Sequence, residues 1–98
     1  MNFKIDPTLE KDSVFIKNLR LCQLRLINNS DFPWLVLIPM KNNLVEITDL
    51  SDDEYVQMNH EIKNIAAKFK DIMKADKLNI QLIAGFDLYH VSEIKPCV

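Results

Sequence analysis

A stripe of apolar side chains between Ser51 and Lys74 is the feature that most constrains the fold. Its members recur every three or four residues, which is the spacing of one helix face: Tyr55, Met58, Ile62, Ile65, Phe69 and Ile72. Ser51 and Glu54 have the spacing of a capping box, and two acidic residues follow Ser51 where the helix dipole favours anions. The pattern predicts one long amphipathic helix over 51–74, with its apolar stripe packed against a β-sheet.

Extended segments precede this helix. Apolar residues alternate over residues 19–27, with a change of phase near Cys22 that indicates a bulge. A dense turn signal at 28–31 leads into residues 32–38, which are apolar on both strand faces. The two segments predict a hairpin whose second strand is central to the sheet.

Shorter elements complete the expected fold. Asp6 and Pro7 predict the start of a short helix, which Leu9, Val14 and Phe15 would pack loosely onto the body. Further extended segments are expected at 44–48, 78–84 and 88–94. The order of helix, strands, long helix and strands predicts an α+β fold with an antiparallel sheet, in a single domain that spans 1–98.

Charge and hydropathy exclude several classes of function. The net charge is -2 and the pI is about 5.6, so there is no basic field to attract nucleic acid. No apolar stretch approaches the roughly 20 residues of a membrane helix, and the N-terminal sequence does not resemble a signal peptide. Cys22 and Cys97 have no CxxC partner. We expect a cytoplasmic protein without a nucleic-acid or membrane partner, a metal or another cofactor.

Three segments in combination resemble a known family. Residues 24–39 carry Phe-Pro-Trp at the entry to the central strand, residues 46–51 are Glu-Ile-Thr-Asp-Leu-Ser, and residues 77–80 are Lys-Leu-Asn-Ile. Together they resemble a bacterial branch of the histidine triad (HIT) family over about residues 12–83. The resemblance implies an α+β domain whose sheets join across a homodimer.

The segment that matches the signature strand of the family departs from the signature. The family has three histidines separated by single apolar residues on this strand, and the bacterial branch would carry one Gln and two His. The resemblance aligns His90 with the first histidine, Ser92 with the nucleophilic one and Ile94 with the third. The chain beyond about residue 83 is therefore divergent or truncated relative to the family.

The chemistry implied by the resemblance is nucleotidyl hydrolysis or transfer. In the family, the central histidine attacks the α-phosphorus of a nucleotide or dinucleoside polyphosphate, which suits a neutral imidazole near pH 7. A serine hydroxyl needs a base to take its proton, and residues i and i+2 share one strand face. His90 and Ser92 are therefore the catalytic candidates, with impaired activity expected.

The resemblance also assigns Leu26, Asn29 and Asn79 to a nucleotide pocket, with a purine nucleotide as the ligand. Asn29 matches an acidic position that holds the ribose, and an amide there keeps its capacity to hydrogen-bond. Alternatively, Asn29 is a turn residue and Asn79 an ordinary strand amide. Two functions follow: a nucleotide-binding relative of the family's hydrolases, or a noncatalytic dimeric scaffold that serves protein interaction.

Overall fold

The computed structural model of the chain describes residues 3–28, 32–83 and 91–97. Along the chain its elements are α1 (Pro7–Asp12), β1 (Val14–Asn18), β2 (Cys22–Asn28), β3 (Pro33–Pro39), the 3-10 helix η1 (Ile47–Asp49), α2 (Asp52–Met73), β4 (Lys77–Ile83) and β5 (Val91–Cys97). The fold is α+β, with one long helix and one short N-terminal helix, as the sequence predicted.

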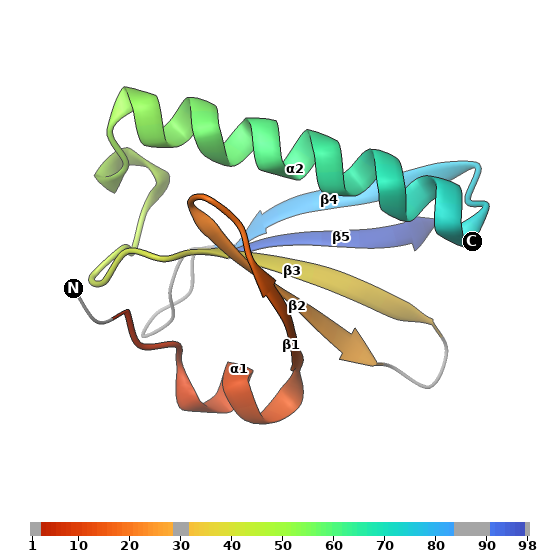
Figure 1. The fold of residues 1–98 in the computed structure, drawn as a ribbon, viewed down its shortest axis with the longest axis horizontal. Coiled ribbons are helices and arrows are strands. Elements are labelled where there is room, and N and C mark those ends of the chain that lie inside the picture. The colour runs from red at the N-terminus through yellow and green to blue at the C-terminus, as the bar shows by residue number, and fades with distance from the viewer. Residues whose placement is uncertain (1–2, 29–31, 84–90, 98) are drawn as a thin grey trace.

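The five strands form one antiparallel sheet in the order β1-β2-β3-β5-β4. Figure 1 shows α2 lying along one side of this sheet and α1 on the other. We call these two sides the α2 face and the α1 face. The predicted hairpin is β2 and β3, and β3 is the central strand, paired with β2 on one side and β5 on the other.

The register of the sheet assigns each strand residue to a face, because directly opposed residues project to the same side. Leu37 opposes Ser92, and Leu35 opposes Ile94. Leu35, Leu37 and Ile94 belong to the core under α2, so Ser92 also projects to the α2 face. Glu93, one residue along, projects to the α1 face.

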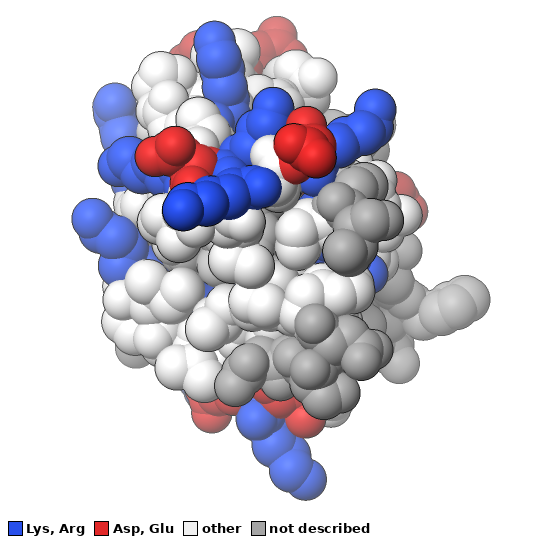
Figure 2. All heavy atoms as spheres, turned by 90° about the vertical axis from the view of Figure 1, so that its right-hand side faces the viewer, with Lys and Arg blue, Asp and Glu red and all other residues white. Residues whose placement is uncertain are grey.

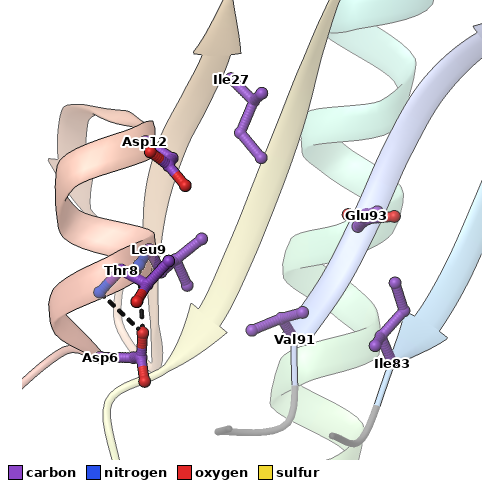
Figure 3. Close-up of a pocket in the computed structure, with 8 residues that line it drawn as sticks. All are labelled: Asp6, Thr8, Leu9, Asp12, Ile27, Ile83, Val91 and Glu93. Atoms are coloured by element: carbon purple, nitrogen blue, oxygen red, sulfur yellow. Dashed lines mark hydrogen bonds between the residues drawn. The ribbon is translucent and has the colours of Figure 1, made fainter.

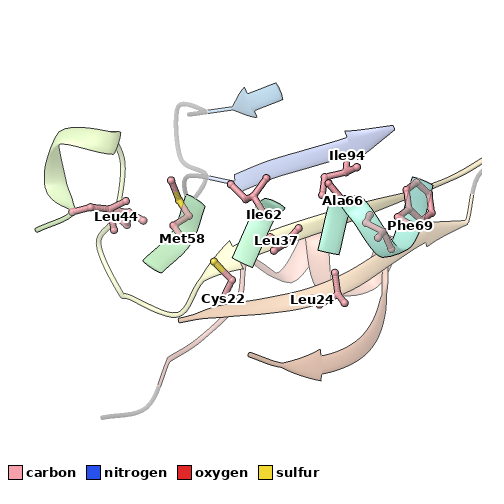
Figure 4. Packing of buried hydrophobic residues seen from close by; sticks show 11 residues of the cluster. Cys22, Leu24, Leu37, Leu44, Met58, Ile62, Ala66, Phe69 and Ile94 are labelled. Carbon is pink, nitrogen blue, oxygen red and sulfur yellow. The ribbon is translucent and has the colours of Figure 1, made fainter. Parts of the chain in front are cut away.

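The core lies between α2 and the sheet (Figure 4). Its members come from β2, β3, β5, α2 and the segments on either side of η1: Cys22, Leu24, Leu35, Leu37, Leu44, Leu50, Met58, Ile62, Ala66, Phe69 and Ile94. The predicted stripe therefore faces the sheet over the middle of α2. At its two ends, Tyr55 and Ile72 are 46% and 75% exposed.

The predicted capping box sets the start of α2. The Ser51 Oγ accepts from the Glu54 N–H at 3.1 Å, and the Ser51 N–H donates to Glu54 Oε1 at 2.8 Å. Lys70 lies in the last turn, where the helix dipole favours cations. Figure 2 views the end of the molecule where α2 terminates and shows Lys and Arg gathered over its upper part. Within the described residues, no helix combines the length and apolar character that crossing a bilayer requires.

Residues 14–18 form a strand that the sequence analysis did not predict. Val14 and Phe15 pair with β2 and are 59% and 49% exposed, so they bury little of their surface in packing α1 onto the body. The change of phase near Cys22 marks the start of β2, and the irregular register lies instead in β1 between Phe15 and Lys17.

Glu61 explains why the chain turns between β1 and β2. Its carboxylate accepts from the backbone N–H of Leu21 at 2.9 Å and of Cys22 at 2.8 Å, and the Gln57 Nε2 donates to it at 2.6 Å. Glu61 is buried on α2, far along the chain from the turn. The turn is therefore fixed by a tertiary contact, which a local sequence pattern does not record.

The segment expected to be extended at 44–48 differs in its second half, because Ile47–Asp49 forms η1. The Asp49 carboxylate accepts from the backbone N–H of Glu46 at 3.0 Å and of Val45 at 3.1 Å, which bends the chain. The same hydrogen bonds hold the pKa of Asp49 below its ordinary value. The segments predicted at 78–84 and 88–94 correspond to β4 and β5, and residues 84 and 88–90 lie outside the described residues.

Candidate functional site

The α1 face of the sheet holds an apolar cavity of about 220 Å³. Its lining residues come from α1 and its N-cap on one side and from β2, β4 and β5 on the other (Figure 3): Asp6, Thr8, Leu9, Asp12, Ile27, Ile83, Val91 and Glu93. The sheet residues among them project to the same face as Glu93. Val91 lies two residues before Glu93 on β5, and Ile83 opposes Val91 across the β4–β5 pair. The cavity thus lies on the α1 face of the sheet, between the strands and α1.

Two kinds of side chain form the wall of this cavity. Leu9, Ile27, Ile83 and Val91 give it an apolar surface, and Asp6, Asp12 and Glu93 are its ionisable members. The Asp6 carboxylate is held by α1, because its Oδ1 accepts from the N–H of Thr8 at 2.9 Å and of Leu9 at 3.1 Å. An apolar wall with few polar groups is typical of a small-molecule site.

Arg25 fixes α1 over the sheet. Its buried guanidinium rises from the α1 face of β2 and donates to the Ser13 Oγ at 2.6 Å and to the Ser13 carbonyl at 3.1 Å. It also donates to the Glu10 carbonyl at 3.3 Å, near the C-terminal end of α1, where a cation is favoured. Arg25 therefore sets the separation of α1 from the sheet at one end of the cavity.

A second group of interactions on the α1 face surrounds Lys95. Its Nζ lies 4.5 Å from the centroid of the Trp34 ring and 3.4 Å from Glu93 Oε1. Trp34 packs at 6.0 Å from Phe32, measured between ring centroids, and its buried Nε1 has no hydrogen-bond partner. Lys95 is thereby shared between an aromatic ring and the carboxylate that lines the cavity.

The structure separates the residues that the sequence predicted for the site. Asn79 is exposed on the α1 face, where it opposes Lys95 across the β4–β5 pair. Leu26 packs against the core, and Ser92 is fully buried beside it on the α2 face. Asn29 and His90 lie outside the described residues. The predicted pocket residues Leu26 and Asn79 therefore do not share a site.

The burial of Ser92 bears directly on its predicted catalytic role. Its Oγ is enclosed and has no hydrogen-bond partner. The core positions of β5 are Ser92 and Ile94, and Val91 and Glu93 project to the other face of the sheet. Catalysis by His90 and Ser92 stays a prediction that this geometry does not support.

Ile27 and Glu93 line the cavity and were missed by the sequence analysis. Each is the immediate neighbour of a residue that was chosen, Leu26 and Ser92 respectively. The alternation of residues along β5 could have identified Glu93, because Ile94 is strongly apolar and belongs in the core. Residues of the same parity as Ile94 accompany it into the core, and its neighbour Glu93 faces the other way.

Comparisons with known proteins agree with this fold. A sequence model of the HIT domain matches residues 8–92. A histidine triad protein from Bradyrhizobium japonicum has a similar structure, with a TM-score of 0.91 at 30% identity over 96% of this chain and 70% of that chain. A histidine triad protein from Sinorhizobium meliloti has a TM-score of 0.90 at 30% identity, with the same coverage.

A histidine triad protein from Marinobacter aquaeolei shares the fold, with a TM-score of 0.90 at 20% identity over 97% of this chain and 69% of that chain. Among curated proteins, none matches the sequence significantly. The similarity thus extends over nearly the whole chain, including α1, the sheet that carries the cavity, and α2.

Proposed function

This chain belongs to the HIT family, and from that premise we propose that it is a noncatalytic HIT domain that binds a small nucleoside or nucleotide in the cavity beside α1. One observation carries the proposal. The face of β5 that lines the cavity presents Val91 and Glu93. We infer that these are the positions of the signature histidines, because the apolar residues between such histidines would face the core as Ser92 and Ile94 do here. The cavity has a partly enclosed apolar surface, and its described lining contains no imidazole.

The residues of β5 account for the absence of nucleotidyl transfer in this proposal. Val91 has no nucleophilic atom, and the hydroxyl of Ser92 faces the core. The carboxylate of Glu93 is paired with Lys95 at 3.4 Å. Loss of a covalent nucleophile lowers a rate by several orders of magnitude, so we expect any turnover to lie several orders of magnitude below that of an intact triad.

The size and surroundings of the cavity support a small ligand. Sites for drug-sized molecules measure roughly 300–1,000 Å³, and this cavity of about 220 Å³ is smaller. It suits one base or nucleoside better than a dinucleoside polyphosphate. Apolar side chains such as Ile27 and Leu9 would contact the base.

Calorimetric titration of the purified protein with millimolar adenosine and AMP tests this proposal, since that range detects affinities as weak as about -4 kcal/mol. Val91→Phe should fill the cavity and abolish the binding heat. Val56→Phe, at a 65% exposed position of α2, is the matched control and should bind as the unmodified chain does. Absence of heat with both ligands, or equal binding by Val91→Phe, would contradict the proposal.

A homodimeric scaffold is the second candidate function, and the edge strand β4 favours it. This strand ends the sheet, so one side of its backbone has no strand partner among the described residues. Ile80 and Leu82 project from it and are 45% and 49% exposed. A second copy of the chain that pairs along β4 would satisfy the backbone and cover both side chains.

Light scattering after size-exclusion chromatography tests the dimer. We expect the mass of two chains, and Leu82→Lys should shift the protein to a single chain by placing a charge in the interface. Val56→Lys, on an exposed part of α2, should leave the mass unchanged. A monomeric mass for the unmodified chain at high micromolar concentration would refute pairing along β4.

A further inference from the structure

We propose that the cavity beside α1 selects ligands that carry no phosphate, so that it binds a neutral nucleoside or nucleobase in preference to the corresponding nucleotide. This inference rests on the proposed function and names the ligand class for the same site. Three observations carry it: the charges that line the cavity, the engagement of the cations on the same sheet face, and the hydrogen-bonding chemistry of carboxylates.

Every ionisable residue in the described lining is acidic. Asp6, Asp12 and Glu93 contribute carboxylates, and the remaining lining residues are apolar apart from Thr8. Figure 3 shows that these three residues come from both sides of the cavity, two from α1 and its N-cap and one from β5. A ligand within the cavity would therefore lie between negative charges on opposite walls.

The two cations on the α1 face of the sheet that lie near the cavity are held by other groups. Arg25 donates to the Ser13 hydroxyl and to carbonyl groups at the end of α1, as described above. Lys95 lies over the ring of Trp34 and beside Glu93. Neither belongs to the described lining, and neither do the lysines that gather where α2 terminates (Figure 2). A phosphate group would find no counter-charge in the described lining.

The balance of charge disfavours a nucleotide for a direct physical reason. AMP brings about two negative charges, and repulsion between like charges strengthens in a partly enclosed apolar space because the effective dielectric constant falls. Lys95 offsets part of the charge of Glu93, whereas Asp6 and Asp12 have no ion-pair partner among the described residues, and Asp6 is stabilised only by two backbone N–H groups of α1. Ionised carboxylates only accept hydrogen bonds, so they match the amino and hydroxyl donors of a nucleoside.

Paired titrations with adenosine and AMP at low and high salt test the inference. At about 20 mM ionic strength we expect AMP to bind at least roughly tenfold more weakly than adenosine. The ratio of the AMP dissociation constant to the adenosine dissociation constant should become smaller at about 0.5 M salt, because salt screens repulsion between partly exposed charges. Steric exclusion of the phosphate would give a ratio that does not depend on salt, and that result would overturn the inference.

Variants identify the carboxylates that are responsible. Asp12→Asn combined with Glu93→Gln should strengthen AMP binding and reduce the ratio to less than about threefold, with adenosine affected much less. The matched control is Asp71→Asn combined with Asp76→Asn, which makes the same change in net charge at exposed positions outside the cavity lining. Asp12→Asn alone alters one exposed side chain and serves as the folded variant if the double substitution destabilises the chain.

The outcomes separate this inference from the proposed function. Binding of AMP as tight as that of adenosine would overturn phosphate exclusion and leave the nucleoside site standing. A ratio unchanged in the Asp12 and Glu93 double variant would show that the carboxylates do not cause the selectivity, which also overturns the inference. Binding of neither ligand would remove the proposed function and this inference with it.

Discussion

The two faces of the sheet are built for different tasks. On the α2 face, a helix of 22 residues covers the strands and its buried side chains fill the space between them (Figure 4). On the α1 face, a helix of six residues has no buried side chain and leaves a cavity. The comparison indicates that burial is concentrated on one face, whereas the other face leaves a cavity in which we propose a ligand binds.

The same strands contribute to both faces through alternate residues. Leu26 faces the core, and its neighbour Ile27 lines the cavity. Ser92 is buried under α2, and its neighbour Glu93 lines the cavity. A shift of one residue therefore changes the role of a side chain completely. Substitutions on the two faces should lower stability to different extents, and the following predictions use this contrast.

The largest effect is expected from removal of a core side chain on the α2 face. Leu37 is fully buried under α2, and Leu37→Ala should lower the free energy of unfolding by about 2–5 kcal/mol through lost burial and the residual cavity. Ile83→Ala, at the cavity on the other face, should cost less than about 1.5 kcal/mol because Ile83 is only partly buried. Urea denaturation measures both, and equal losses would break the comparison between the faces.

The next largest effect should come from the contact that joins α2 to the turn between β1 and β2. Glu61→Ala would leave the backbone N–H groups of Leu21 and Cys22 without an acceptor and should lower the free energy of unfolding by about 2 kcal/mol. Lys63→Ala, on an exposed position of the same helix, should change it by less than about 0.5 kcal/mol. A loss no greater than that of the control would mean that Glu61 does not hold the turn.

The thiol of Cys22 makes stability on the α2 face depend on pH. Burial raises the pKa of Cys22 well above its ordinary value of 9.0, and the charge of Glu61 and a hydrogen bond to it raise it further. The unfolded thiol loses its proton above pH 9 while the folded thiol keeps it, so this contribution to stability is complete below pH 9 and declines above it. The decline attributable to Cys22 is at most about 1.4 kcal/mol per pH unit.

Comparison of the unmodified chain with Cys22→Ala separates the effect of the Cys22 thiol on the pH dependence of stability from the effects of lysine and tyrosine side chains, which are the same in both proteins. Urea denaturation between pH 8 and pH 10.5 should give a steeper decline for the unmodified chain. Parallel pH dependences for the two proteins would mean that the thiol ionises equally well in the folded state, contrary to its burial.

The smallest effect on stability is expected at Ser92. Its hydroxyl is buried without a partner, so Ser92→Ala should change the free energy of unfolding by less than about 0.5 kcal/mol or increase it slightly. Adenosine binding should remain unchanged, because Ser92 faces away from the cavity. A loss of binding or of any measured hydrolysis in this variant would restore the catalytic assignment of Ser92. Denaturation and calorimetry together provide the measurement.

Local patterns in the sequence were sufficient for much of the fold. The three- and four-residue spacing of Met58, Ile62 and Phe69 predicted α2, and the Ser51 capping box predicted its start. The β2–β3 hairpin followed from the turn signal at 28–31. The strand β1 was missed because Val14 and Phe15 remain half exposed and owe their strand conformation to pairing with β2.

The site was harder to predict, because neighbouring residues of a strand project to opposite faces of the sheet and an error of one residue selects the wrong face. The resemblance placed Leu26 and Ser92 in the pocket, and the described pairing places both on the α2 face. Asn79 lies on the α1 face, and its role as a ligand contact stays a prediction. The resemblance indicated which strand carries the site. The core-facing residues of that strand then show which face of the sheet the site occupies.

The sequence by itself determined the α+β class and the helix that covers the sheet, because these depend on the local spacing of apolar residues and on local caps, and its motifs indicated the family by resemblance. Only the tertiary structure decided the turn that Glu61 holds, the position of α1 under the control of Arg25, and the acidic cavity that results. Each of these arises where residues distant in the chain meet, and their contact depends on the register of the sheet.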